Sequence, residues 1–184
     1  MQIAVMAWVA ALCGVMAAPA AAAEVMSTYT DINLDECLVM QSDDFGTTWA
    51  CPGYKGMPTY VAERSLRFHV SFGFGADQEP AAKQTLEPHN TLGPEIEWRL
   101  TNAGGKWRPF AAILRYFVDG DGGEGQVLVV TRIGPGTTCQ IAYVDALANE
   151  NAEELAQQAA DEMAAGFDCA DAPEVIGDFA AWER

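Results

Sequence analysis

The feature that most constrains the fold is a series of strand-type patterns between residues 59 and 146. Residues 66–74 alternate apolar and polar side chains with a period of two, which is typical of a half-buried β-strand. Residues 110–119 and 126–133 are more continuously apolar, which suits central strands covered on both faces of a sheet. Shorter strands are expected at residues 59–62, 96–101 and 138–146.

A single amphipathic helix is predicted after these strands. Asn151 favours the N-cap position, and the acidic Glu153 and Glu154 follow it in the first turn, where they complement the helix dipole. Gly166 is a natural C-cap. Apolar residues between these ends recur at a spacing of three and four, as Ala152, Leu155, Ala156, Ala159, Ala160, Met163, Ala164 and Phe167.

Strands with short connections followed by one terminal helix predict an α+β fold. We expect an antiparallel sheet of about five to seven strands, packed by the C-terminal amphipathic helix. An all-β sandwich with the helix as an appendage is the alternative. Residues 24–184 are expected to form one domain, to which residues 24–57 add one or two short strands. Residues 75–94 are polar and rich in turn formers, and a loop of this length is often functional.

An apolar stretch opens the sequence and ends in Ala21-Ala22-Ala23, before Glu24. Small residues that close an apolar run are typical of a secretory signal peptide, so we expect residues 1–23 to be removed. The protein is then exported to the periplasm or beyond, with no stable membrane insertion. An uncleaved membrane anchor is the alternative, since the run nears the length of a membrane span. The residues before Cys13 do not resemble a lipobox.

Four cysteines follow this leader, and an even number in an exported chain predicts two disulfides with three possible connectivities. We expect neighbours along the chain to pair. A zinc site is the alternative, but the sequence has no CxxC motif and its two histidines, His69 and His89, lie far apart. We therefore predict no metal and no cofactor. The expected disulfides are Cys37–Cys51 and Cys139–Cys169.

The chain is strongly acidic, with 26 aspartates and glutamates against ten lysines and arginines and a formal net charge of −16. Such a surface would repel phosphate groups, which argues against a general nucleic-acid or anionic-membrane binder. It permits a basic protein as partner. Acidity that simply keeps an exported protein soluble is the alternative.

An acidic glycine-rich turn at residues 119–125 superficially resembles a calcium loop. Calcium needs six to eight oxygen ligands, and the spacing of an EF-hand with its distal glutamate is absent. A flexible hairpin between two strands, with glycines at positions that need positive φ, is the favoured interpretation.

Arginines lie in the middle of four successive predicted strands. If these strands are neighbours in matching register, the guanidinium groups form a ribbon across one face of the protein. Arginine binds carboxylate and phosphate with two parallel hydrogen bonds, so such a ribbon predicts a site for a small anionic ligand or for an acidic segment of a partner. Cross-strand ion pairs with Glu63, Glu97 or Asp145 are the alternative. The candidate binding residues are Arg67, His69, Arg99, Arg115 and Arg132.

Residues 49–60 combine aromatic side chains with tight turns and would be braced by the first disulfide. Tyr54 and Lys55 at the centre of this segment are candidate binding residues, because aromatic anchors dominate protein interfaces. Trp49 and Tyr60 are equally consistent with a place in the core.

Catalytic motifs are missing from the sequence. It contains no G-x-S-x-G and no H-E-x-x-H, and it offers only two histidines as a general base. Glu95 and Glu97 lie two residues apart, but this spacing alone does not establish an acid–base pair. We therefore expect a binding protein rather than an enzyme, with a hydrolase as the less favoured alternative.

The run Cys-Pro-Gly-Tyr-Lys-Gly-x-Pro-x-Tyr-Val-Ala-Glu at residues 51–63, with Tyr-Val-Asp-Ala-Leu-Ala at residues 143–148, resembles small exported proteobacterial proteins of no assigned function. That resemblance covers residues 37–169 and implies no activity. The overall format of leader, acidity, disulfides and strands is similar to that of periplasmic lysozyme inhibitors, which bind a basic enzyme and insert a loop into its cleft. This similarity implies a basic partner such as a lysozyme, and it identifies no inhibitory residues.

Overall fold

The computed structural model of the chain describes residues 23–87, 89–120 and 123–180. The predicted leader, apart from Ala23, lies outside these residues, as do Asp121, Gly122 and Trp182. No helix within the described residues is long and apolar enough to cross a membrane.

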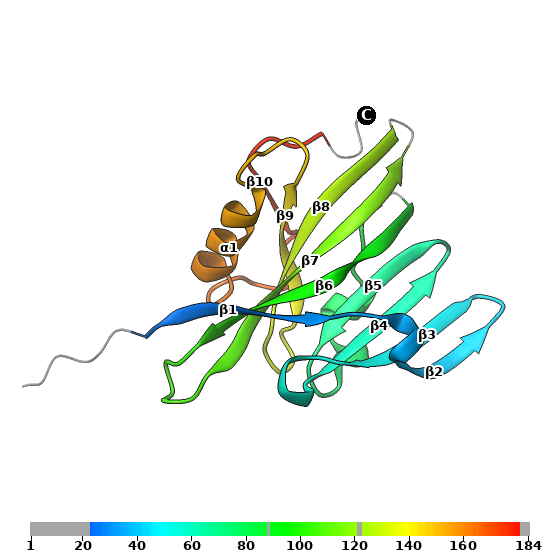
Figure 1. The fold of residues 1–184 in the computed structure, drawn as a ribbon, viewed down its shortest axis with the longest axis horizontal. Coiled ribbons are helices and arrows are strands. Elements are labelled where there is room, and N and C mark those ends of the chain that lie inside the picture. Colours follow the sequence, from blue (N-terminus) through cyan, green and yellow to red (C-terminus); the bar gives the residue numbers. More distant parts are fainter. Residues whose placement is uncertain (1–22, 88, 121–122, 181–184) are drawn as a thin grey trace, which may run out of the picture.

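The described residues form ten β-strands in two sheets and one α-helix, α1 (Ala152–Met163), with four short 3-10 helices (Figure 1). Sheet A has the strand order β1 (Val25–Asp31), β6 (His89–Thr101), β7 (Arg108–Gly120), β8 (Gly123–Arg132), β9 (Cys139–Asp145), β10 (Glu174–Ile176). Sheet B has the order β2 (Leu38–Asp43), β3 (Gly46–Pro52), β4 (Pro58–Arg64), β5 (Arg67–Phe72). The 3-10 helices are η1 (Leu34–Glu36), η2 (Tyr54–Gly56), η3 (Ala76–Gln78) and η4 (Pro80–Lys83).

The sheet-rich α+β class with one helix is confirmed within the described residues, but the number and arrangement of the strands differ from the prediction. Instead of one antiparallel sheet of five to seven strands there are two sheets, and β9 and β10 pair in parallel. The helix is not the last element, because β10 follows it along the chain. The edge strands β1, β2 and β10 bury little side-chain surface, so no apolar period marked them in the sequence.

Sheet A is covered on both faces. One face packs against sheet B, where Trp98 and Tyr116 meet Val61, Val70 and Phe72 in the main core. The other face packs against α1 through small helix side chains. Consecutive residues 111–114 and 127–130 are each at most 3% exposed, which confirms that residues 110–119 and 126–133 form central strands. The helix residues buried in this second contact are Ala152, Ala156, Ala159 and Ala160.

Trp98 lies at the centre of the main core and is fully buried. Its Nε1 donates a hydrogen bond to Thr30 Oγ1 at 2.8 Å, and its ring meets Phe72 edge-on at 5.2 Å between centroids. Gly53 passes so close that a Cβ there would stand 2.6 Å from the indole ring. The indole therefore requires glycine at that position of the chain.

Both predicted disulfides are present. Cys37–Cys51 links the end of η1 to β3, and Cys139–Cys169 links the start of β9 to the segment that follows the helix.

Several local expectations were wrong. Strand β5 covers only residues 67–72, and Leu66 and Phe74 just beyond its ends are exposed. Residues 75–94 are not a structureless loop, because they contain η3, η4 and the start of β6. The buried carboxylate of Glu79 holds this segment in place by accepting hydrogen bonds from the backbone N–H groups of Gly136 and Thr138.

The helix ends also differ in detail. Asn151 occupies the N-cap position, but its side chain makes no capping hydrogen bond. The C-cap is Ala164, and Gly166 lies two residues further along the chain. The buried alanines contribute more to the position of this helix than its capping residues do, because most helical stability comes from packing.

Replacing both Cys139 and Cys169 by serine is expected to lower the free energy of unfolding by about 3–4 kcal/mol, because that disulfide spans 30 residues. Urea unfolding under oxidising conditions measures the loss. The matched control replaces Cys37 and Cys51, which span 14 residues and are expected to contribute about 3 kcal/mol. A loss below about 1 kcal/mol in the first variant would contradict this role.

Candidate functional site

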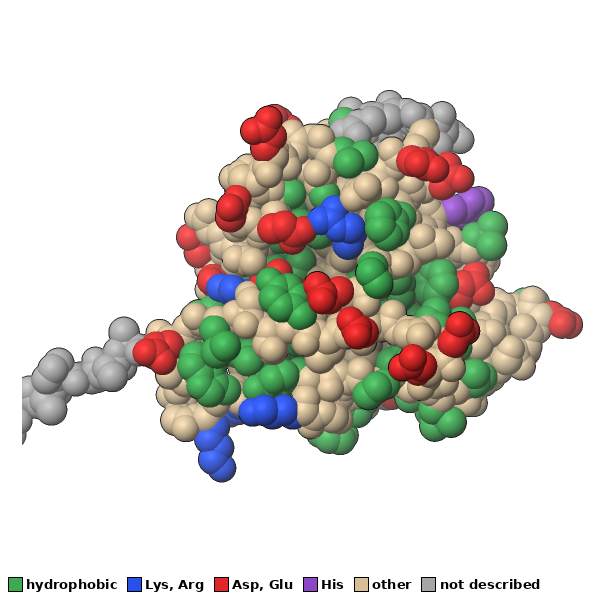
Figure 2. Space-filling model, viewed as in Figure 1, with side chains coloured by type: hydrophobic (Ala, Val, Ile, Leu, Met, Phe, Trp, Pro, Cys, Tyr) green, Lys and Arg blue, Asp and Glu red, His purple; other side chains and the backbone are tan. Residues whose placement is uncertain are grey.

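A groove of about 640 Å³ opens where the β4–β5 hairpin of sheet B meets the ends of β6, β7 and β8 in sheet A. Hydrophobic and acidic side chains lie together on the surface at this end of the molecule (Figure 2). The apolar side chains that line the groove are Leu66, Phe68, Phe117, Val118 and Leu147. Its acidic side chains are Glu63, Asp119 and Glu124, with His89 beside them.

Leu66 is presented to the groove by a strained turn. Ser65 and Leu66 form the two-residue connection between β4 and β5, with φ angles of 54° and 60°. Positive φ at both positions suits asparagine or glycine, and a leucine there is uncommon. The leucine side chain is 63% exposed, so packing in the core does not explain its presence. Strain that the surrounding structure holds in place is a feature of functional sites.

Polar contacts hold this turn in its conformation. The Glu63 carboxylate accepts a hydrogen bond from Leu66 N at 2.7 Å, and Leu66 O accepts one from Asn90 N at 3.0 Å. Asn90 is buried, and its Oδ1 accepts a further hydrogen bond from Phe68 N at 2.9 Å. Asn90 thus connects β6 of sheet A to β5 of sheet B at the floor of the groove.

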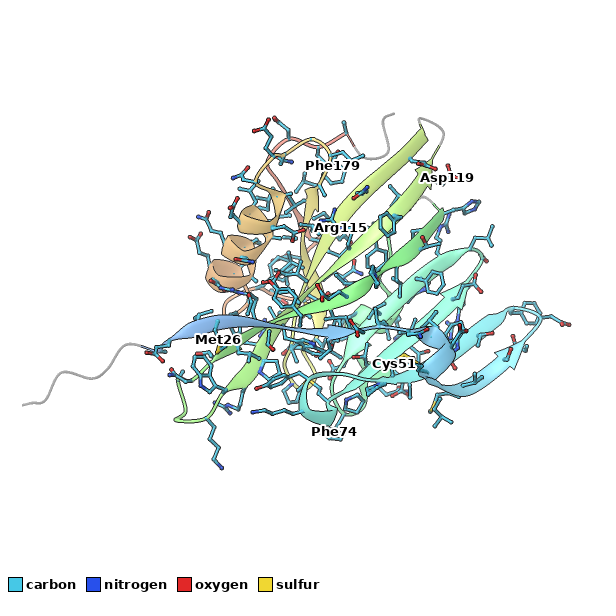
Figure 3. All side chains as sticks on the ribbon, in the orientation of Figure 1. Met26, Cys51, Phe74, Arg115, Asp119 and Phe179 are labelled. Carbon is cyan, nitrogen blue, oxygen red and sulfur yellow. A yellow bond between two sulfur atoms is a disulfide. The ribbon has the colours of Figure 1, made fainter. Side chains whose placement is uncertain are left out.

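The rim of the groove gathers negative charge. Asp119 and Glu124 stand directly opposite each other across the β7–β8 hairpin, and Figure 3 labels Asp119 near the end of β7. Like charges at directly opposed positions of a sheet are destabilising. None of the described side chains that line the groove is a lysine or an arginine. The groove is therefore electronegative as well as apolar.

The turn considered as a calcium loop lies beside this rim. Gly120 pairs with Gly123, so a hairpin joins β7 to β8, while Asp121 and Gly122 lie outside the described residues. Among the described residues, no group of three or more histidines, cysteines, aspartates or glutamates could hold a metal ion.

The predicted arginine ribbon does not extend over four neighbouring strands. Arg67 and His69 are on β5 in sheet B, whereas Arg99, Arg115 and Arg132 are on β6, β7 and β8 in sheet A. The pairing of Arg99 and of Arg132 with Ala111 places both on the face that packs against α1. Figure 3 shows Arg115 in the middle of sheet A, beside the helix.

These three arginines attach the helix to the sheet. Arg99 Nε donates to Asp161 Oδ1 at 2.9 Å, and a second hydrogen bond from its Nη2 makes the pair bidentate. Ion pairing is thus the structural role of Arg99 and Arg115. Of the expected partners, Glu97 lies 3.9 Å from Arg99, whereas the remaining ion-pair partners come from the helix rather than from Glu63 or Asp145. The three partners are Asp161 for Arg99, Glu153 for Arg115 and the carbonyl oxygen of Phe167 for Arg132.

A second hollow of about 340 Å³ lies between α1 and sheet A, and Glu95 and Glu97 both line it. The Glu97 carboxylate is almost completely buried, accepts a hydrogen bond from Ser27 Oγ and lies 3.9 Å from Arg99 Nη1. Burial raises the pKa of the Glu97 carboxyl above its usual range, while Ser27 and Arg99 oppose the shift. This carboxyl belongs to the network that attaches the helix, and Glu95 is exposed beside it.

Arg67 and His69 lie on the face of sheet B that points away from the main core. Arg64, which the sequence analysis did not select, stands directly opposite Arg67 on β4, and His69 pairs with Ala62 next to it. Burial lowers the pKa of His69 below its usual range. The alternation of side chains along β4 was sufficient to place Arg64 on this face. The sequence analysis missed Arg64 because it lies at the end of the strand.

The segment at residues 49–60 packs largely against the core. Trp49 stacks on Phe68 at 6.4 Å between ring centroids, and Tyr54 is half-buried with its ring 6.5 Å from that of Trp98. Lys55 is exposed, and its Nζ lies 5.0 Å from the centroid of the Tyr54 ring. Of the two binding candidates in this segment, Lys55 is the more available to a partner.

Comparison with protein-family models, with curated proteins and with solved structures found no match to this chain. The geometry and charge of the groove therefore provide the main basis for a functional conclusion.

Replacing Arg99 by glutamine is expected to cost about 2–3 kcal/mol of unfolding free energy, because it leaves the buried Glu97 carboxylate without its cation. Asp161→Asn is expected to cost about 1 kcal/mol, since Asp161 is about one-third exposed. Urea unfolding of both single variants and the double variant gives the coupling energy. Strictly additive losses would contradict a direct role of the pair in attaching the helix.

Replacing Leu66 by asparagine is expected to raise the unfolding free energy by about 0.5–1 kcal/mol, because asparagine tolerates positive φ better than leucine. Thermal and urea unfolding measure the change. Leu38→Asn, which replaces another exposed leucine outside the turns, is the control and is expected to show no gain. A destabilised Leu66→Asn variant would show that the leucine side chain contributes to packing within the fold and is not simply exposed to the groove.

Proposed function

We propose that this protein is an exported binding module that holds a basic, partly apolar segment of a protein partner in the groove between sheet B and the ends of β6–β8. A secreted lysozyme is the kind of partner that fits, since it combines a strongly basic surface with exposed apolar side chains. The two disulfides are compatible with an oxidising compartment, and we place the protein in the periplasm or outside the cell.

The observation that carries this proposal is the combination of displayed apolar side chains with unopposed negative charge in one groove. Leu66 and Phe117 expose apolar surface that a partner could cover. Asp119 and Glu124 are like charges directly opposite each other on the hairpin, an arrangement that a cation placed between them would stabilise. A lysine or arginine flanked by apolar residues satisfies both features.

The net charge of −16 supports the same partner through a longer-range effect. An acidic protein attracts a basic one before contact, which raises the association rate at low ionic strength. The complex is therefore expected to weaken as salt screens the charges. Arg99, Arg115 and Arg132 have partners within the fold, so they add little support to a purely anion-binding function.

The test reverses the groove charges with Asp119→Lys and Glu124→Lys and measures affinity for a c-type lysozyme by isothermal titration at low and at physiological ionic strength. The double variant is expected to lose about 100-fold in affinity, because two close charge pairs become repulsive. The matched control, Glu162→Lys with Asp171→Lys, changes the net charge equally. It alters the far end of the molecule, where Arg132 at the end of β8 contacts Phe167.

The control is expected to lose less than about fivefold, through long-range attraction alone. Equal losses in both variants would show that lysozyme responds to net charge and not to the groove. An amphipathic peptide of alternating lysine and leucine serves as a second probe. If neither lysozyme nor this peptide binds, the proposed function is wrong.

A further inference from the structure

We propose that Arg64, Arg67 and His69 form a second site, on the outer face of sheet B, that binds the carboxylate or phosphate group of a small polyhydroxylated molecule. This site is separate from the groove, because the strand alternation of β4 directs Glu63 toward the groove and Arg64 to the opposite face of the sheet.

The first observation is a pair of like charges placed directly opposite each other. Arg64 pairs with Arg67 across β4 and β5, and His69 follows on the same face of β5. Two guanidinium groups at opposed positions repel each other, so the arrangement costs stability in the absence of an anion. This occurs in a chain with 26 acidic residues that could have provided a partner.

The second observation is that, among the described residues, neither Arg64 nor Arg67 forms a close ion pair with a carboxylate. The ion pairs found among the described residues involve Arg99 and Arg115 only. Asp43, which lies within electrostatic range of Arg64, accepts hydrogen bonds instead from Gln41 Nε2 and Phe45 N. Asp43 thus offsets the charge of Arg64 only at longer range, and both guanidinium groups can still accept an external anion.

The third observation is a buried donor without an acceptor. Arg67 Nε is shielded from solvent and has no hydrogen-bond partner within the described part of the chain. A buried unsatisfied donor is costly and uncommon in folded proteins. An oxyanion that receives hydrogen bonds from the guanidinium group would remove this cost.

The fourth observation indicates the kind of molecule to which the bound anionic group belongs. A hollow of about 350 Å³ lies on the same face of sheet B, and Arg64 contributes to its lining. Thr48, Tyr60 and Asp77 line it as well, and their hydroxyl and carboxylate groups can exchange hydrogen bonds with hydroxyl groups of a ligand. The Asp77 carboxylate also accepts a hydrogen bond from Gln78 Nε2. A sugar that carries one acidic group matches these donors and acceptors, with its anion placed against Arg64, which lines the hollow and stands opposite Arg67.

The experiment titrates the mature protein with D-glucuronate, D-glucose 6-phosphate, inorganic phosphate and D-glucose, and measures affinity by isothermal titration and by NMR shifts of the arginine Nε–H groups. We expect at least one anion to bind and to shift the Arg67 Nε–H signal. Arg67→Gln and Arg64→Gln are each expected to weaken that binding by about tenfold or more, since each removes a charge-assisted contact. The matched control is Arg108→Gln, an exposed arginine of β7 in sheet A.

The anion that binds most tightly identifies the acidic group, and preference for the acidic sugars over inorganic phosphate supports a role for the hollow. Equal binding of neutral glucose would overturn the proposal, because the cations would then contribute nothing. Binding that Arg108→Gln weakens as much as Arg67→Gln would overturn it too, since a general charge effect would explain it. The proposal would also be overturned if none of the four probes bound to the wild-type protein while circular dichroism showed that its fold was intact.

Discussion

Burial of the two central strands of sheet A on both faces is the constraint on which the rest of the structure depends. On one side, strands β7 and β8 belong to the main core that they share with sheet B, and on the other they pack against α1, so neither layer can move without exposing apolar surface. Polar side chains on the helix-facing side must then find partners inside the fold. Arg99, Arg115 and Arg132 do so by binding the helix and the residues that follow it.

The same constraint determines where polar and apolar side chains remain accessible to a ligand or a partner. Sheet B covers only part of sheet A, and its β4–β5 hairpin ends beside the open ends of β6, β7 and β8. Acidic and apolar side chains gather on the side of the hairpin that faces this opening (Figure 2), and the strand register places Arg64 and Arg67 on the other side. Glu63 and Arg64, adjacent in sequence, thus contribute to two surfaces of opposite charge because successive residues of a strand point to opposite faces.

A structural feature could be predicted from the sequence where the residues that specify it lie close together along the chain. The alternation of Phe68, Val70 and Phe72 identified β5, and the apolar runs identified β7 and β8, because a buried face imposes its period on the sequence. The two disulfides followed from the order of the cysteines along the chain. Strands β1 and β10 carried no such period, since they are held at the sheet edges by backbone pairing.

The candidate groove could not be found in this way, because Glu63, Asn90, Asp119 and Leu147 are separated by many residues. The loop-like composition of residues 75–94 was misleading for a related reason. Its polar residues serve the fold, as Glu79 does by accepting backbone hydrogen bonds from residues near the start of β9. Composition shows that a segment is polar but does not show where its partners lie.

The amino-acid sequence by itself determined the sheet-rich class, the central strands and the single helix, because periodicity and small helix residues are local properties. For the cysteines it favoured pairing of neighbours among three possible connectivities, and the structure has that pairing. Only the tertiary structure decided that the strands divide into two sheets, that three arginines bind the helix or the segment after it, and that Arg64 stands opposite Arg67. The physical reason is that a strand's alternation fixes which residues share a face, whereas the sheet it joins is chosen by long-range packing.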